Sequence, residues 1–565
     1  MSAVITRIAV VVMLALCCSA HAAYYGAADW RPNAWGLPAP QAALSRFPAC
    51  QYKDESGLSF EVVSRGGGDI EITLPGALQA GKAYQFSVWL KAAKGSPTVD
   101  LFYRSDAAPY ETWAVRTVSL GATWTRVQLH GISTGLTVGS VRIASRQLGA
   151  AVCIGPAQIE PMGMHAVGVP IRPMKVTPRL FGVHLNQLGT HRGWPSFNPG
   201  IVRLWDSGTT WADLQPTKRP IDWSSVHGRR LDLYVQHIKK NNPQGNVLFT
   251  LAMTPVWAGS IHSKRCNDSS YGPGSCTAPS DLNDWRDYVR SVVTRYAKDI
   301  RYWEVWNEAD IWTQWDGSPQ RMFDLVRAAY EEIKAIDPTL VVIGPNVTSN
   351  GLRFLNEFLV AGGARYVDAL SVHAYLERDP ERALSSLRNV QETANAYGML
   401  PPLWNTESGI SATSAATQGG LSAETTLAQG LIGSAALGVS NFNYYTWEGS
   451  GFVPLVTSDF LTSTSTGVAL ARVRRWINGA TLSYLPDPVA GMSLIQIERD
   501  GTKAYVAWTE KDSGLLSVTA IPGADRYQTL LIRADKAVSG ESIAVGTEPT
   551  LFFGSEFRFD DSWVP

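Results

Sequence analysis

The chain has 565 residues, of which 45% are hydrophobic and 17% are charged, and its basic and acidic side chains balance at 49 each. This length exceeds what one hydrophobic core holds, so the sequence predicts several domains of ordinary globular composition. A chain without net charge lacks the positive field that nucleic-acid binding requires, and we therefore expect no nucleic-acid partner.

The N-terminal segment has the pattern of a secretory signal peptide. Arg7 precedes an apolar run over residues 8–18, and Ala20-His21-Ala22 supplies small residues at a cleavage position. We expect residues 1–22 to be removed and the mature protein to be secreted or periplasmic. The apolar run is shorter than the roughly 20 residues that cross a bilayer, and no later stretch resembles a membrane span.

We expect the four cysteines that follow the signal segment to form disulfides, because the compartment that an exported protein reaches is oxidising. Of the possible pairings we predict Cys50–Cys153 and Cys266–Cys276, since each pair falls within one predicted domain. The first would close a loop of about 100 residues, which the chain-entropy model credits with roughly 4–5 kcal/mol. The spacings do not resemble a zinc site.

Residues 23–165 have the pattern of an all-β domain. The runs 83–90, 98–103 and 124–129 alternate between apolar and polar residues, and the run 153–160 has the pattern of a closing strand. Turn residues separate these runs at short intervals, which predicts a β-sandwich. The segment resembles jelly-roll domains of the carbohydrate-binding-module type, which implies either sugar binding or a purely structural role.

Over residues 175–478 the pattern changes to strands that alternate with helices. The patterns at 284–298 and 319–336 predict amphipathic helices, the second with Ser318 as its cap and Pro319 in its first turn. Most expected strands are short continuous apolar runs, as parallel strands buried on both faces require. This order over about 300 residues predicts an α/β fold, a (β/α)8 TIM barrel. The expected strands are 180–186, 201–204, 247–251, 302–306, 340–344, 369–373, 403–406 and 442–446.

The last segment, residues 479–565, returns to strand patterns, which are clearest at 504–509 and 528–533. We predict a small β-sandwich that packs against the barrel. Two β domains would then flank the TIM barrel, one on each side of it in sequence.

Two glutamates directly follow predicted barrel strands. The run that ends at Trp306 leads to Asn307 and Glu308, and the run that ends at Thr406 leads to Glu407. The active site of a TIM barrel lies at the C-terminal ends of its strands, so both carboxyl groups should lie on one rim. Cleavage of a glycosidic bond requires such a pair, one group to protonate the leaving oxygen and one to attack the anomeric carbon.

The segments around these glutamates, WEVWNE at 303–308 and WNTESG at 404–409, resemble the catalytic strands of clan A retaining glycoside hydrolases. Their arrangement is most similar to family 39, which includes β-xylosidases and bacterial exopolysaccharide hydrolases. The resemblance covers the barrel. It implies that Glu308 is the general acid/base and Glu407 the nucleophile, and that the reaction needs no metal ion and no organic cofactor.

The same resemblance implies roles for further residues near the strand ends. Asn307 is similar to the donor that binds the sugar 2-hydroxyl, and Arg203 resembles the arginine that keeps the nucleophile ionised. Tyr375 is expected to hydrogen-bond Glu407. Trp447 resembles the aromatic platform under the sugar. The remaining residues that we expect to line the first sugar subsite are His373, His184, Asn186 and Trp257.

The two acids must differ in pKa if one is to hold a proton and the other a charge. We expect Arg203 and hydroxyl donors to keep the pKa of Glu407 low. Apolar neighbours and the negative charge of Glu407 should raise the pKa of Glu308. The loop at 254–282, closed by the second disulfide, should form one wall of the cleft.

The sequence favours a monomeric retaining hydrolase that acts on a β-linked polysaccharide or oligosaccharide, with bacterial exopolysaccharide as one substrate class. A transglycosylase would share every site residue and differ only in the acceptor that reaches the intermediate. A carbohydrate-binding protein without catalysis is a third interpretation, against which the presence of both acids argues. The sugar, the linkage and the choice between endo and exo action stay open.

Overall fold

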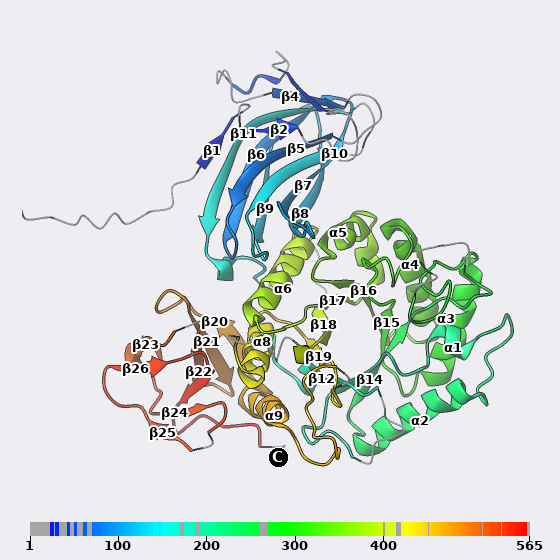
Figure 1. Ribbon diagram of the computed structural model, residues 1–565, viewed down its shortest axis with the longest axis vertical. Helices are drawn as coiled ribbons and strands as arrows, with labels where there is room; N and C mark the ends of the chain where they lie inside the picture. The colour runs from blue at the N-terminus through cyan, green and yellow to red at the C-terminus, as the bar shows by residue number, and fades with distance from the viewer. Residues whose placement is uncertain are drawn as a thin grey trace, which may run out of the picture.

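The computed structural model describes residues 23–561 except 27–28, 33–41, 46–49, 54–59, 65–69, 146, 148–149, 170–173, 187–192, 260–265, 267–268, 399–401, 414–419, 450, 511 and 533. The predicted signal peptide at 1–22 lies outside the described residues. Figure 1 shows a β-sandwich above a barrel, with a smaller β region beside the barrel.

The N-terminal part is a sandwich of two antiparallel sheets, as predicted. Alternating apolar side chains such as Phe86, Val88 and Leu90 fill the space between the sheets, because successive residues of a strand point to opposite faces. The predicted Cys50–Cys153 disulfide is present and ties the sequence before β4 to β11. One sheet has the order β3(Ala42–Ser45), β4(Phe60–Ser64), β11(Ala151–Met162), β6(Ala83–Lys94), β9(Thr125–Ile132), with β1(Ala23–Tyr25) on β11; the other has β2(Arg31–Pro32), β5(Ile70–Leu78), β10(Gly139–Ser145), β7(Thr98–Ser105), β8(Thr112–Ser119).

The central part is a closed parallel barrel, which confirms the predicted TIM-barrel fold. Its strands are almost completely buried, as apolar runs between a packed interior and surrounding helices must be. They lie close to the predicted runs, and the fifth continues beyond the expected end at Gly344 to Thr348. In order they are β12(Phe181–His184), β13(Ile201–Leu204), β14(Asn246–Leu251), β15(Tyr302–Val305), β16(Val341–Thr348), β17(Ala369–His373), β18(Leu403–Ser408) and β19(Asn441–Tyr444).

Helices surround the barrel, and their apolar faces cover its outer surface (Figure 1). The helix predicted at 319–336 has those bounds and is capped by Ser318, whose hydroxyl accepts the Arg321 N–H. The helix predicted at 284–298 begins earlier, at Leu282, because Asp281 caps its N-terminus. It also ends earlier, at Tyr296. The helices are α1(Trp211–Leu214), α2(Val226–Asn241), α3(Leu282–Tyr296), α4(Pro319–Ile336), α5(Leu352–Val360), α6(Pro380–Asn395), α8(Ala423–Ala436) and α9(Ser465–Ile477).

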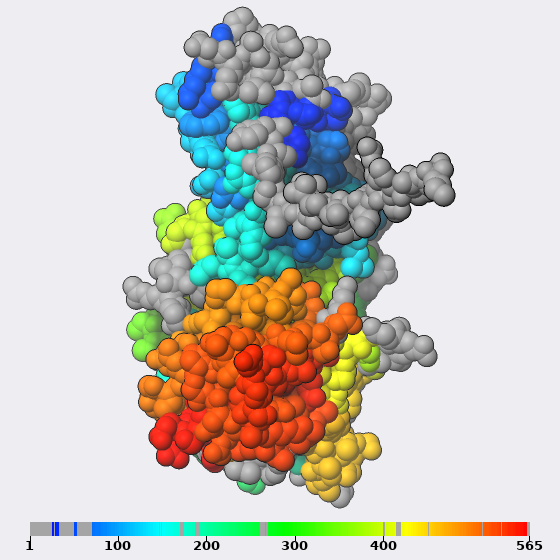
Figure 2. Space-filling view, turned by 90° about the vertical axis from the view of Figure 1, so that its left-hand side faces the viewer, coloured from blue at the N-terminus to red at the C-terminus, as the bar shows by residue number. Residues whose placement is uncertain are grey.

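The C-terminal part forms a larger antiparallel sheet and a separate two-stranded antiparallel sheet, which fits the predicted small β domain. The larger sheet uses both faces: Ile497 and Val506 pack into the barrel core, whereas Leu494 and Tyr505 pack into a separate small core. Figure 2 shows this region and the sandwich occupying opposite ends of one face. The sheet is β20(Thr481–Tyr484), β21(Met492–Arg499), β22(Thr502–Thr509), β27(Thr550–Phe553), β24(Arg526–Thr529), β25(Lys536–Ala537), and the pair is β23(Gly514–Ser517), β26(Ser542–Val545).

The strand predicted at 528–533 is wrong in its bounds. The strand β24 ends at Thr529, and the Leu531 N–H donates to a carboxylate oxygen of Glu548 instead of a neighbouring strand. The side chains of Leu531 and Ile532 are exposed. Their apolar character therefore suggested a strand that the backbone does not form.

The sandwich docks on the barrel through α5 and α6. Asn389 exchanges two hydrogen bonds with the backbone of Ile132, and Glu392 contacts His130 at 3.0 Å. The Thr117 N–H donates to the Tyr397 hydroxyl. Specific polar contacts thus fix the sandwich at the outer surface of the barrel. Within the part of the chain that the structure describes, no helix is long and apolar enough to cross a membrane.

The two disulfides should contribute unequally to stability. We expect replacement of Cys50 and Cys153 by serine to lower the free energy of unfolding by about 2 kcal/mol more than the same replacement of Cys266 and Cys276. Loop-closure entropy grows with separation, which is 103 residues for the first pair and 10 for the second. Urea unfolding of the two double variants measures the difference, and equal losses would contradict the entropic account.

Candidate active site

Arg203 lies at the centre of the barrel mouth. It comes from β13, its side chain is completely buried, and its guanidinium contacts groups from three directions. Nε donates to Glu304 at 2.7 Å, Nη1 to Glu407 at 2.7 Å and Nη2 to the Asn307 side-chain oxygen at 2.8 Å. Burial alone would lower the pKa of Arg203, but the two carboxylates outweigh it and raise that pKa. A fixed positive charge therefore holds Asn307 and Glu407 in place.

Glu407 lies near the end of β18 and is 7% exposed. Its Oε2 accepts the Arg203 hydrogen bond, and its Oε1 accepts the hydroxyl hydrogen of Tyr375. The predicted contact between Tyr375 and Glu407 is therefore present. Two donors on separate oxygens fix the orientation of the carboxylate.

Glu308 follows β15 through a tight turn. Trp306 and Glu308 both take left-handed backbone, with φ of 68° and 45°, a conformation that costs non-glycine residues on the order of 1–3 kcal/mol. Contacts hold this turn: the Trp306 N–H donates to the Leu251 carbonyl, and the Glu308 N–H donates to the side-chain oxygen of Asn346. The Glu308 side chain is half-buried, and its Oε1 lies 2.9 Å from Nδ1 of His373.

The two glutamates face each other across a short gap. One oxygen of Glu308, one oxygen of Glu407 and a ring nitrogen of His373 all lie within 4.8 Å of one another. A retaining mechanism is typical of carboxyl groups about 5–5.5 Å apart, and an inverting mechanism of roughly 6.5–9.5 Å. The geometry therefore favours retention.

The predicted order of the two pKa values is wrong. Burial raises the pKa of Glu407 above its ordinary value, although Arg203 and Tyr375 oppose this shift. Burial also acts to raise the pKa of Glu308, but the hydrogen bond from His373 and the charge of Arg203 outweigh it, and that pKa is lowered. The sequence suggested the apolar surroundings of Glu308 but not the donor that His373 presents to it.

Several buried polar residues beneath the glutamates were not predicted. The most important is Glu304, which is completely buried and points into the barrel from β15. Burial acts most strongly and raises its pKa, but the charges of Arg203 and His373 together with hydroxyl donors outweigh burial, and the pKa is lowered. A charged residue inside an otherwise apolar strand was the available signal. The groups that donate to its oxygens are Arg203, Thr250, Asn346, Ser371 and Thr406.

A second polar cluster involves the loop at 254–282. Tyr271 and Tyr445 donate to the two carboxylate oxygens of Asp206 at 2.6 and 2.7 Å, and the Asn186 side chain donates to the Tyr445 hydroxyl at 3.1 Å. Burial and the charge of Asp206 raise the pKa of Tyr271, and the charge of Glu407 adds to the shift. The cluster therefore lies close enough to Glu407 for their charges to interact.

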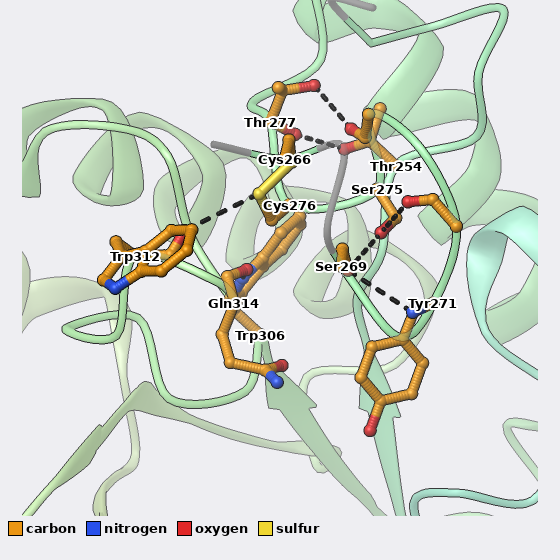
Figure 3. The surroundings of a disulfide bond; sticks show 12 residues. Thr254, Cys266, Ser269, Tyr271, Ser275, Cys276, Thr277, Trp306, Trp312 and Gln314 are labelled. Carbon is orange, nitrogen blue, oxygen red and sulfur yellow. Dashed lines mark hydrogen bonds between the residues drawn. A yellow bond between two sulfur atoms is a disulfide. The ribbon is translucent and has the colours of Figure 1, made fainter. Parts of the chain in front are cut away.

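The predicted Cys266–Cys276 disulfide is present in this loop. Figure 3 shows it beside Trp306 and Trp312, with the ring of Tyr271 extending away from it. The loop thus carries Tyr271 to Asp206, which lies just after Trp205 beyond the end of β13. Tyr271 and Asp206 are 65 residues apart, so no local pattern in the sequence could have joined them.

The other predicted lining residues differ in their placement. His184 is completely buried, and Nε2 lies 3.1 Å from the Thr406 carbonyl; burial holds its pKa well below the ordinary value. Trp447 is 3% exposed and packs against Phe460. Trp257 is half-buried, and its indole N–H donates to the Gln215 carbonyl. Their contacts with sugar stay predictions.

Glu308, His373 and Glu407 are also a combination that could hold a metal ion. However, both oxygens of Glu407 already accept hydrogen bonds, from Arg203 and Tyr375, and Nδ1 of His373 faces a carboxylate oxygen. A guanidinium on the same carboxylate also opposes a cation. This donor set suits proton transfer at Glu308 and nucleophilic attack by Glu407 better than metal coordination.

These features define a class, the (β/α)8 barrels that carry two facing carboxyl groups at the C-terminal ends of their strands. Residues 261–401 match the model described as "Glycosyl hydrolases family 39". The chain is therefore related to that family through the central part of its barrel.

Individual relatives agree with this relationship. The chain is 33% identical over 122 residues to a β-xylosidase of Geobacillus stearothermophilus, which is 20% of this chain and 24% of that protein. It is 30% identical over 128 residues to a β-xylosidase of Caldicellulosiruptor saccharolyticus, 21% of this chain and 25% of that protein. The matches thus span about a quarter of the length of these relatives.

A solved structure supports the fold. A family 39 glycoside hydrolase from the gut symbiont Bacteroides cellulosilyticus WH2 superimposes with a TM-score of 0.52 at 15% identity, covering 82% of this chain and 96% of that chain. At this identity the similarity concerns the architecture alone.

The buried ion pair under the site should be important for stability. We expect Glu304→Gln to lower the free energy of unfolding by about 3–5 kcal/mol, because it leaves part of the buried Arg203 charge uncompensated. Asp287→Asn, which removes a partner of the exposed Arg290 pair, is the control and should cost less than about 1 kcal/mol. Denaturant unfolding of both variants checks this, and similar losses would show that Arg203 does not depend on Glu304.

Proposed function

We propose that the protein is a retaining glycoside hydrolase in which Glu308 is the general acid/base and Glu407 the nucleophile. The observation that carries the proposal is the approach of the two carboxyl groups within 4.8 Å at one rim of the barrel, each held by its own donors. The family 39 match over the central barrel supports the same assignment.

The proposed reaction has two displacements. Glu308 gives its proton to the oxygen of the leaving group while an oxygen of Glu407 attacks the anomeric carbon, and the glycosidic bond breaks. The sugar is then bonded to Glu407 as an ester. Glu308, now a carboxylate, takes a proton from water, whose oxygen attacks the same carbon and releases Glu407 as a carboxylate.

The surrounding residues suit this sequence of steps. Arg203 stabilises Glu407 whenever it is a carboxylate, at the start and at the end of the cycle. A guanidinium can only donate hydrogen bonds, so Arg203 must face the side-chain oxygen of Asn307. The amide NH2 group of Asn307 therefore points away from the guanidinium. We propose that this NH2 group donates to a sugar hydroxyl.

We propose β-linked oligosaccharides or polysaccharides as the substrate class, with β-xylosides as the first to test because the matched relatives are named β-xylosidases. Bacterial exopolysaccharide is a further candidate of the same class. The N-terminal pattern of residues 1–22 supports export, so we also propose that the enzyme acts outside the cytoplasm.

The roles of the two glutamates predict different defects. Glu407→Gln should abolish turnover on all glycosides while ligand affinity changes little. Glu308→Ala should strongly slow substrates with poor leaving groups but spare the first step for aryl glycosides with activated leaving groups, since these need no proton. Initial rates and burst kinetics on paired β-xylosides measure this. Equal losses on both substrates for Glu308→Ala would contradict its role as the acid.

The pH dependence gives a test of Tyr375. Removal of a donor to a carboxylate disfavours the charged form, so Tyr375→Phe should raise the pKa of Glu407 further. In the enzyme–substrate complex, whose pKa values kcat reports, Glu407 must be ionised to attack, so the acidic limb of kcat should move to higher pH. Tyr444→Phe is a matched control, since its buried hydroxyl donates to the Val453 carbonyl. An unmoved acidic limb in Tyr375→Phe would argue against Glu407 as the nucleophile.

A further inference from the structure

Asn346 connects the backbone and the side chain of the proposed acid/base. It lies on β16, is completely buried, and accepts the Glu308 N–H at 2.7 Å with its side-chain oxygen. A peptide N–H can only donate, so the atom of the Asn346 amide that faces Glu308 must be the oxygen. This contact fixes which side of the amide carries the NH2 group.

The NH2 group of Asn346 in turn constrains His373. It lies 2.8 Å from Nε2 of the ring, and an amide NH2 can only donate. A hydrogen on Nε2 would therefore point at another donor, and within the described residues no other acceptor for it is present. The ring must accept at Nε2 and carry its hydrogen on Nδ1. Nδ1 lies 2.9 Å from Oε1 of Glu308, so His373 donates to that carboxyl group.

We propose that Asn346 is a positioning residue that fixes the neutral Nδ1–H tautomer of His373, so that the ring always presents a donor to Glu308. The inference rests on the proposed function, because the donor matters only if Glu308 exchanges protons. It favours the carboxylate form of Glu308, which is the product of the first displacement and the base of the second. The opposite tautomer would accept from protonated Glu308 and favour the acid form instead.

Burial makes this arrangement persistent. His373 is 1% exposed and Asn346 is not exposed, so water cannot easily replace either partner. The Asn346 NH2 group also lies near the oxygens of Glu304, Ser371 and Thr406, at 2.7–3.0 Å, all of which can accept. These contacts hold the amide in the orientation that the Glu308 N–H already requires.

Other charged and titratable groups also face Glu308, so a pH profile must be compared with a matched variant. They are His373 from β17, Tyr375 after β17, Arg203 from β13, Glu304 from β15, Asp310 after β15 and Glu407 from β18. Asn443→Ala is the control, because Asn443 is a completely buried barrel asparagine whose side chain bonds Asn441 and none of these groups.

The direct test is the tautomer of His373, read by NMR on full-length protein labelled with ¹⁵N in the histidine rings and assigned with His373→Gln. The wild-type ring should show a hydrogen on Nδ1 and a bare Nε2, and Asn346→Ala should populate the Nε2–H form. A wild-type ring that carries its hydrogen on Nε2, or on both nitrogens at neutral pH, overturns the proposal. This measurement does not need turnover, so it decides the inference even if no glycoside is cleaved.

Kinetics give the second readout. In Asn346→Ala the alkaline limb of kcat, which reports the pKa of the acid in the enzyme–substrate complex, should move to higher pH by roughly one unit, the scale of one lost hydrogen bond to a charged group. His373→Phe should move it similarly, and the double variant should add little, because both changes act on the same Nδ1–H donor. Asn443→Ala should lower stability without moving the limb. If Asn346→Ala behaves like Asn443→Ala, its role is merely structural and the proposal fails. If the wild-type protein cleaves no glycoside, the proposed function fails instead.

Discussion

The site depends on one buried cation. Arg203 has no exposed surface, so its charge is tolerable only because Glu304 and Glu407 neutralise it and Asn307 accepts its remaining donor. Glu304 and Glu407 depend on Arg203 in the same way, because neither carboxylate could remain charged at that depth without the guanidinium. Stability and the proposed function are therefore coupled: the interaction that compensates the buried charge also sets the position of Glu407, the proposed nucleophile. Glu304 serves as the permanent counter-ion, which leaves Glu407 free to lose its charge during a covalent step.

The fold and the main carboxylates could be predicted because their signals are local. Apolar runs of strand length reveal a barrel, and the rule that strand ends carry the site then selects Glu308 and Glu407 among many acids. Arg203 was singled out by its resemblance to the arginine of the clan A glycoside hydrolases. Glu304 and Asn346 were not predicted from the sequence. Their importance depends on which face of a strand points inward and on which residues meet there from other strands. Tyr271 escaped because its partner Asp206 is brought to it by the fold alone.

The pKa shifts of Glu308 and Glu407 were predicted wrongly for a different reason. Each is the difference between a burial penalty and the donors that oppose it, and the two contributions are of similar size. The sequence suggested tryptophan neighbours for Glu308 and an arginine neighbour for Glu407, and the contact between Arg203 and Glu407 is present. It could not indicate that His373 donates to Glu308, or that Glu407 is the more deeply buried of the two. A prediction of proton location needs the complete set of contacts, and residue types alone do not supply it.

The order of the two pKa values also bears on how the enzyme would be activated. In the chain without substrate, burial raises the pKa of Glu407 while His373 and Arg203 lower the pKa of Glu308, whereas the proposed first displacement needs a charged Glu407 and a protonated Glu308. A sugar in the cleft would exclude water from the half-buried Glu308 and bring a leaving oxygen to it, both of which favour its protonated form. Glu407 is already almost fully buried and keeps its two hydrogen-bond donors, so the exclusion of water should change its pKa less. Because Glu308 is the less buried of the two acids, substrate binding should raise its pKa more than that of Glu407, which is the change that the proposed first displacement requires.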